Sequence, residues 1–357
     1  MSEMKLAVGT YTMCAGHVPD ARGKGVEILS FDEVTGSFSE LYTMGEMKNP
    51  TYLSWNGNTS SLYAIEEDPE NVGMIRQFIR EKDGSFGKGI SLRGQCGALC
   101  HISVNHSGDS LYASSYQNGS ICGFHLNRDS EPEEWGRISY EGKGPDPLRQ
   151  EAPHAHQILL DPEETRAYIC DLGTDRVHIH SLERGLKGED GCLELPAGYG
   201  PRHMVFDPSG AYAFILCELK AQLILARRNR KDGTLKIVED IALPAESFSG
   251  TPAPAAIKMH PSGHTLALSN RFIDRIEVYG LVREEDRLTL QWIDGFSSEG
   301  KTPRDITFSP SGDWLFIANQ DSHNIAAKRF DGKTGIPESS RPVSYETGSP
   351  VCIVPLL

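Results

Sequence analysis

The feature that most constrains this chain is a phrase that recurs about every 50 residues along the sequence. Each copy has a short apolar run, a tight turn, and a second run rich in β-branched and aromatic residues. The copies begin at Thr51, His101, His156, Arg202, Ala255 and Arg304. Their turns, at Asn56, His106, Pro162, Pro208, Pro261 and Pro310, lie 46 to 56 residues apart. Self-similarity at this period indicates repeated structural units, and seven units of this length account for the whole chain.

The turns favour β-hairpins. Three copies contain Pro-Ser-Gly, in which proline presets φ, serine bonds locally and glycine accepts positive φ. Each hairpin is followed by another alternating pair of runs, as in residues 176–195. Four antiparallel strands per unit are the content of a propeller blade.

The two ends of the chain complement each other. Residues 5–47 supply three strands without a leading apolar strand, whereas residues 349–357 read as a leading strand with nothing after it. Pairing them closes the ring and removes an exposed edge. The sequence therefore predicts an all-β, seven-bladed β-propeller, a single domain over residues 1–357, whose C-terminal strand closes the N-terminal blade.

The charge balance limits the kinds of partner that the protein is expected to bind. The formal net charge of −14 disfavours nucleic acid and anionic membranes, and no stretch approaches the roughly 18 apolar residues of a membrane span. The N-terminus is too polar for a secretory signal, so a cytoplasmic location is expected. The eight scattered cysteines are expected to be mostly buried free thiols. Cys96-x-x-x-Cys100-His101 lacks a second ligand pair, so neither a metal nor another cofactor is expected.

Several segments are expected to be structural or solvated. Residues 128–153 and 220–233 read as blade-connecting loops whose charges face solvent. His178 and His180 alternate on an outer strand and are expected to be solvated. Strand alternation points His203 into the sheet packing, with His101 in the same position of its own repeat, and Lys220 and Lys258 suggest no special role.

One mouth of the channel collects the polar positions. In a blade, the first residue of the innermost strand and the last residue of the second strand meet at the same face. The first set is Cys100, His156, Arg202, Ala255 and Arg304, and the second is Glu67, Tyr116, Leu172, Glu218, Arg271 and Gln320, with Asp171 beside Leu172. Most are polar or charged, which predicts a binding site; a salt-bridge ring that plugs the channel is the alternative. His154, two residues before His156, is expected to pack at the rim if it does not enter the site.

Some familiar signatures are absent. The chain has no Gly-x-Ser-x-Gly, His-Glu-x-x-His, Walker or Gly-x-Gly-x-x-Gly motif, which disfavours serine hydrolases, zinc proteases and nucleotide enzymes. It also lacks the Gly-His and Trp-Asp pairs of a WD40 array.

Three phrases, GPRHMVFDPSGAYAFILCEL, PHAHQILLDPEETRAYICDLGTDRVHIHSL and TPRDITFSPSGDWLFIANQDSHNI, resemble the lactonase seven-bladed propeller family. This family includes propeller-type 6-phosphogluconolactonase and 3-carboxy-cis,cis-muconate lactonizing enzyme, and the resemblance runs along essentially the whole chain. Its most specific element is Gly-Pro-Arg-His followed, sixteen residues after the arginine, by glutamate.

The resemblance implies a catalytic set at the mouth. The family's histidine, two arginines and glutamate correspond to His156, Arg202, Arg271 and Glu218. Substrate-binding roles are expected for the remaining polar mouth positions, Arg304, Gln320, Glu67, Tyr116 and Asp171. A longer connection over residues 130–152 and the Glu66-Glu67 pair depart from the family pattern.

The implied function is hydrolysis of an anionic sugar-acid lactone, with 6-phosphogluconolactone, an intermediate of the pentose phosphate pathway, as the expected substrate. Such a reaction needs an anion clamp, a base that activates water and a donor for the oxyanion. Glu218 and His156 are both candidates for the base, and Arg202 or Arg271 for the oxyanion donor. A muconate-type lactonizing enzyme, another sugar lactonase, and a non-catalytic metabolite- or protein-binding propeller remain alternatives.

Overall fold

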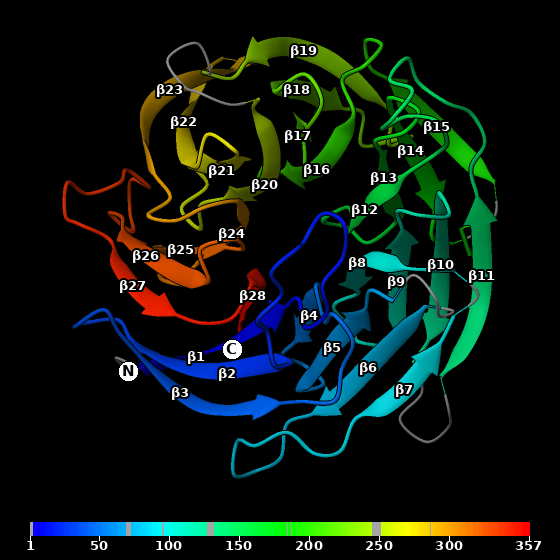
Figure 1. The fold of residues 1–357 in the computed structure, drawn as a ribbon. Coiled ribbons are helices and arrows are strands. Elements are labelled where there is room, and N and C mark those ends of the chain that lie inside the picture. Colours follow the sequence, from blue (N-terminus) through cyan, green and yellow to red (C-terminus); the bar gives the residue numbers. More distant parts are fainter. Residues whose placement is uncertain are drawn as a thin grey trace.

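The computed structural model describes residues 3–68, 73–94, 96–126, 132–183, 185–186, 188–244, 251–285 and 287–357. In this part of the chain the strands form seven four-stranded antiparallel sheets, arranged as blades around a central axis (Figure 1). The all-β seven-bladed propeller predicted from the repeat is confirmed.

The blades follow one another along the chain. The first is β28-β1-β2-β3, made by Pro350–Pro355, Glu3–Thr10, Val26–Asp32 and Ser37–Met44. The second and third are β4 to β7 (Leu53–Asn56, Ser61–Glu66, Met74–Ile79, Ile90–Arg93) and β8 to β11 (Leu99–Val104, Ser110–Ser115, Ser120–His125, Glu133–Ser139). The fourth and fifth are β12 to β15 (Ala155–Leu160, Arg166–Asp171, Arg176–Ser181, Glu189–Glu194) and β16 to β19 (Pro201–Phe206, Tyr212–Cys217, Gln222–Arg228, Leu235–Ala242). The sixth and seventh are β20 to β23 (Ala253–Met259, Thr265–Arg271, Arg275–Glu284, Arg287–Ser297) and β24 to β27 (Pro303–Phe308, Trp314–Asn319, Asn324–Arg329, Val343–Glu346).

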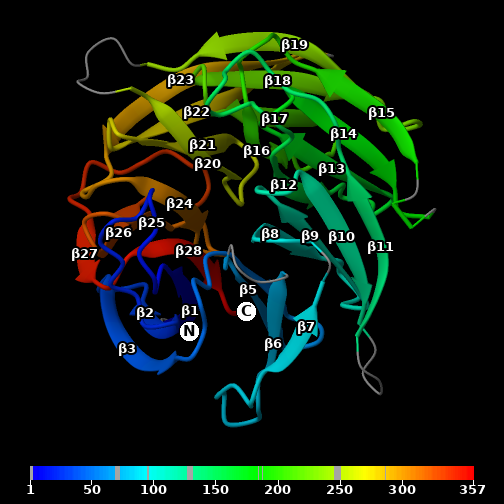
Figure 2. The ribbon, with the colours of Figure 1, turned by 45° about the vertical axis from the view of Figure 1, so that its right-hand side comes forward.

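The C-terminal strand closes the N-terminal blade, as predicted. Strand β28 pairs with β1 in a register that runs from Leu6 opposite Pro355 to Thr10 opposite Pro350. Figure 2 shows this red strand lying beside the blue strands of the first blade. Because the closing strand is the innermost of its blade, it also packs on the neighbouring sheets and joins both ends of the chain to the core.

The core lies between neighbouring blades. Residues at alternate strand positions face the next sheet, as where Phe31 of β2 meets Phe316 of β25 edge-to-face at a ring separation of 4.8 Å. Close packing on both faces of each blade leaves the channel ends of the inner strands fixed relative to one another. The ring is therefore a rigid frame for side chains that project into the channel.

Two predicted loops prove to contain strands. Residues 133–139 form β11, the outermost strand of the third blade, and residues 222–228 form β18 within the fifth; residues 128–131 lie outside the described residues. The expectation that their charges are solvated is wrong for Arg228, which is buried. Strand β11 is the outermost of its blade and has one edge near solvent, so its composition resembles that of a loop.

The cysteine expectation holds for most positions. All eight cysteines are free; five are buried, Cys100 is partly buried, and Cys14 and Cys192 are exposed. No described helix has the length and apolar character needed to cross a bilayer.

Candidate functional site

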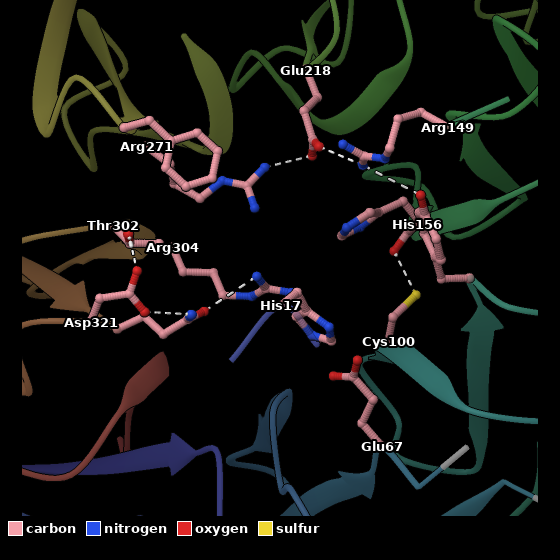
Figure 3. A pocket seen from close by; sticks show the side chains of 13 residues that line it. His17, Glu67, Cys100, Arg149, His156, Glu218, Arg271, Thr302, Arg304 and Asp321 are labelled. Atoms are coloured by element: carbon pink, nitrogen blue, oxygen red, sulfur yellow. Dashed lines mark hydrogen bonds and ion pairs between the residues drawn. The ribbon is translucent and has the colours of Figure 1, made fainter. Parts of the chain in front are cut away.

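A cavity of about 400 Å³ opens at one mouth of the channel (Figure 3). It is lined by His17, Glu67, Cys100, Tyr116, Arg149, His156, Glu218, Arg271, Phe272, Thr302, Arg304, Gln320 and Asp321. A smaller chamber beneath it shares several of these residues and is also lined by Arg202 and His203. The starts of the innermost strands and the ends of the second strands thus meet at this face, as the repeat predicts.

The cavity side chains that come from the innermost strands lie at β-bulges. In six of the seven blades the register between the first two strands is irregular, and in four of these the residue left without a partner is Cys100, His156, Arg202 or Arg304. A β-bulge of this kind re-aims a side chain, and bulges are over-represented next to active sites. The bulges therefore turn these four side chains toward the mouth of the channel.

Glu218, immediately after β17, is the centre of an arginine cluster. Its carboxylate lies 3.0 Å from Arg202 Nε, 2.7 Å from Arg271 Nη2 and 2.7 Å from Arg149 Nη2. The contacts with Arg202 and Arg271 are close ion pairs without hydrogen-bond alignment, whereas Arg149 donates a hydrogen bond. Burial alone would raise the pKa of Glu218, but the positive charges of the three arginines outweigh burial and hold it far below its usual range.

Arg202 remains a cation in this crowded place. Burial and the charge of Arg271 lower its pKa, Glu218 opposes them, and the result is a pKa of about 9. One Nη1 hydrogen bond goes to the backbone carbonyl of Ala255. The cluster therefore contains more positive than negative charge at neutral pH.

His156 is buried beside this cluster. Its Nδ1 atom has no hydrogen-bond partner among the described residues. Burial and, after it, the charge of Arg202 hold the pKa of His156 well below its usual value, so the imidazole is neutral at neutral pH. Its ring packs edge-on against Tyr116 and His203, at separations of 5.7 and 5.2 Å, which fixes its place in the wall.

The opposite wall of the cavity carries a second guanidinium site. Arg304 donates to Gln320 Oε1 at 3.3 Å and lies over the ring of Tyr11, 5.4 Å from its centre. Gln320 in turn donates to Asp321, 2.8 Å away. Among the described residues, no carboxylate lies within 4 Å of Arg304, so its charge is available to a ligand.

Glu67 completes the rim between these walls. Thr51 Oγ1 and the Tyr11 hydroxyl donate to its carboxylate at 2.6 and 3.2 Å. His17, from the segment between β1 and β2, bonds the same Tyr11 hydroxyl at 3.0 Å. Glu66 instead pairs with Arg76 at 2.6 Å, outside the cavity.

Comparison with known proteins decides the family. A family model described as "Lactonase, 7-bladed beta-propeller" matches residues 5–355. The chain belongs to the seven-bladed β-propeller lactonase family.

The relatives of this lactonase-family propeller include a 6-phosphogluconolactonase of Bacillus subtilis, 27% identical over 349 residues that cover 97% of this chain and 96% of the relative. An uncharacterized protein of Lactococcus lactis is 28% identical and covers 93% of both chains. Among solved structures, a putative 6-phosphogluconolactonase of Bacteroides fragilis is similar with a TM-score of 0.86 at 25% identity, covering 99% and 98% of the two chains. The periplasmic gluconolactonase of Pseudomonas aeruginosa has a TM-score of 0.88 at 23% identity and covers 99% of both, a likeness of fold.

Most of the site residues predicted from the repeat and from the lactonase-family resemblance lie together in the structure. The cavity is lined by His156, Glu218, Arg271, Arg304, Gln320, Glu67 and Tyr116, and Arg202 lies just beneath it. Their roles in binding or chemistry stay predictions.

Asp171 does not reach the cavity. Its buried carboxylate accepts hydrogen bonds from the backbone of His154 at 2.7 Å and from Thr174 Oγ1 at 2.6 Å, which makes it a structural brace. The ring of His154 stacks on Tyr116 at 4.2 Å, so this histidine packs against the rim while His156 enters the site.

The expectation that His178 and His180 are solvated is wrong. Both are buried, because alternate residues of an outer strand face the next blade rather than water. Tyr140, after β11, stacks on His178 at 3.9 Å and hydrogen-bonds His180 Nε2 at 2.9 Å.

The expectation for His203 is wrong as well. The bulge at Arg202 breaks the alternation, so the ring of His203 lines the inner chamber instead of the sheet interior. Lys258 lines the opposite mouth of the channel with Tyr52 and His101. Burial would lower the pKa of Lys258, but Tyr52 and Asp305 raise it above its usual value.

The sequence reasoning missed Arg149, His17, Phe272, Thr302 and Asp321 as cavity residues. Arg149 comes from the long connection before β12, which is anchored by Gln150 Nε2 on Leu172 O and Asp175 at 2.9 and 2.8 Å. The unusual length of this connection was the sequence feature that could have pointed to Arg149 as a cavity residue. Phe272 and Asp321 directly follow predicted residues, whereas nothing in the repeat points to His17.

Proposed function

We propose that this lactonase-family chain hydrolyses 6-phosphogluconolactone to 6-phosphogluconate. The observation that carries the proposal is the joint lining of one cavity by a neutral imidazole, a carboxylate with three arginines, and a separate guanidinium without a carboxylate partner. Relatives named as 6-phosphogluconolactonases, in Bacillus subtilis and Formosa agariphila, support the choice of substrate.

In this proposal His156 activates water. A carboxylate held by three guanidinium groups, as Glu218 is, has little affinity for a proton and makes a poor base. His156 is neutral, and the arginine charge that depresses its pKa is opposed when an anionic substrate binds. The base therefore gains strength once the substrate is in place.

Arg202 and Arg271 stabilise the developing charge. Water adds to the lactone carbonyl carbon, its proton passes to His156, and the carbonyl oxygen becomes an oxyanion beside the guanidinium groups. Collapse of this intermediate breaks the bond to the ring oxygen, which takes the proton back from His156. Glu218 holds the two arginines in position throughout.

Arg304 holds the phosphate. Its guanidinium enters the cavity from the side opposite His156 and Arg149, and a fork of donors suits phosphate oxygens. The substrate then spans the cavity between its two walls.

Lactone turnover compared between 6-phosphogluconolactone and unphosphorylated gluconolactone tests the proposal, with spontaneous hydrolysis subtracted. We expect clear preference for the phosphorylated lactone, and Arg304→Ala should raise its KM while changing hydrolysis of gluconolactone little. His156→Ala should lower kcat more than Glu218→Gln, which should change kcat and KM together because it disturbs the arginines.

The matched control for His156→Ala is His264→Ala, since His264 is exposed. A folded protein that turns over neither lactone above the spontaneous rate would overturn the proposal. Equal turnover of both lactones would leave a lactonase but remove the phosphate assignment.

A further inference from the structure

A second chemically equipped cluster lies away from the cavity, on the two outer strands of the fourth blade. A ring nitrogen of His178, a carboxylate oxygen of Glu189 and the sulfur of Cys192 all lie within 4.8 Å of one another. Among the described residues this is the only such grouping of three or more histidine, cysteine and acidic side chains. None of the three lines the cavity at the mouth.

The strand register explains how the three meet. His178 of β14 lies opposite Cys192 of β15, so their side chains share one face of the sheet. A bulge then shifts the register, which places Glu189 rather than Asp190 opposite His180. Without that extra residue, strand alternation would turn Glu189 to the other face.

Contacts on both ring nitrogens and on the ring face fix the orientation of His178. Its Nε2 lies 3.4 Å from the fully buried carboxylate of Asp171, while Nδ1 contacts Glu189 at 2.6 Å. Tyr140 of the neighbouring blade stacks on the ring with an interplanar angle of 8°. Metal-binding histidines are commonly oriented by a carboxylate that contacts the ring nitrogen not bound to the metal. Asp171 contacts one nitrogen of His178 in this way, and the other nitrogen faces the cysteine and the glutamate.

We propose that His178, Glu189 and Cys192 form a binding site for one divalent transition-metal ion of the zinc type. Thiolate, imidazole and carboxylate together suit zinc or cobalt and do not suit calcium or magnesium, which prefer oxygen ligands. The ion displaces the proton between His178 and Glu189 and the thiol proton of Cys192, and both protons pass to solvent. Asp171 keeps its contact with Nε2 and acts as a positioning residue.

The site's access fits this assignment. Cys192 is exposed, and 43% of the Glu189 side chain is exposed while His178 is buried. An ion can therefore enter from solvent and tie the outermost strand β15 to β14. This bond braces the blade edge and does not take part in turnover at the channel mouth.

Titration with Co²⁺ tests the site, using the full chain freed of any affinity tag and kept reduced. We expect one equivalent to bind with a sulfur-to-cobalt charge-transfer absorption, and Zn²⁺ to displace it and raise the melting temperature. Cys192→Ser should abolish the absorption band. Asp171→Asn should weaken binding by about 10–100-fold, the usual effect of removing an orienting carboxylate.

The matched control is Cys14→Ser, which removes the other exposed thiol and should leave the band intact. Glu189→Gln, at a half-exposed position, gives a second test if another variant fails to fold, and it should weaken binding. No saturable binding, or a band that survives in Cys192→Ser, overturns the site. Chelation should leave lactone turnover unchanged, so this outcome and that of the proposed function are independent.

Discussion

Two buried arginine clusters, on opposite faces of the propeller, differ in how their charges are matched. At the turn after β12, one guanidinium, that of Arg228, bonds both Asp161 and Glu163, the latter at 2.7 Å. Its remaining contacts are with the Tyr168 hydroxyl at 3.0 Å and the Gly210 carbonyl at 3.1 Å. At the channel mouth the ratio is reversed, because Glu218 alone faces three guanidinium groups.

The difference separates structure from binding. Each nitrogen of the Arg228 guanidinium has a partner and the cluster carries no surplus positive charge, so Arg228 ties two blades together. The mouth cluster keeps surplus positive charge beside a cavity, which is unfavourable in the free protein and is relieved by an anion. A buried arginine therefore indicates a binding site only where its charge is unmatched and space adjoins it.

The largest expected effect concerns the matched cluster. Arg228→Ala leaves Asp161 buried without its countercharge and should lower the free energy of unfolding by about 3–5 kcal/mol. Denaturant unfolding measures this loss, and kcat/KM of the folded fraction should stay at the parental value. A large loss of turnover in folded protein would break the distinction between the clusters.

At the mouth, Arg271→Ala should show the opposite pattern. Removing one donor to an oxyanion lowers kcat by about 10²–10³-fold, whereas the folded state loses little because two arginines still face Glu218. Steady-state kinetics and denaturant unfolding on the same preparation check both halves. Parental kcat with strong destabilisation would make this cluster structural, like that of Arg228.

The pH dependence sharpens the comparison further. The pKa of His156 is lowered by burial and by Arg202, so the neutral base persists at neutral pH and is lost only as pH falls well below 6.5. The kcat/KM for unphosphorylated gluconolactone should therefore stay level from neutral pH to 6.5 and fall in stronger acid. Arg202→Gln should move that acid limb upward, whereas Arg228→Ala should not; an unmoved limb in Arg202→Gln would remove His156 as the titrating base.

The smallest effect is expected at the surface. Arg230, 57% exposed, lies 4.0 Å from Glu163 at the edge of the matched cluster. Arg230→Ala should change the free energy of unfolding by less than about 0.5 kcal/mol and leave kinetics unchanged. An effect comparable to that of Arg228→Ala would mean that exposure does not distinguish these arginines.

The repeat and its turn residues specify the ring, its closure and the identity of most residues at the mouth. The period of about 50 residues specifies equal blades, and position within each repeat specifies height along the channel. These two properties of the sequence assign five mouth residues to one face of the ring, namely His156, Arg202, Glu218, Arg271 and Arg304. Asp171 does not reach the cavity because adjacent strand residues point in opposite directions, and Asp171 lies one residue before the position that faces the channel.

The remaining features depend on pairing between strands and on packing between blades. The bulges that aim Cys100, His156, Arg202 and Arg304 at the mouth depend on pairing with a second strand, which no single strand's sequence displays. Arg149 and His17 reach the cavity on segments outside the repeat, so no periodicity could place them. The burial of His178 likewise depends on Tyr140 of another blade, because side-chain environments in a propeller are set between sheets as well as within them.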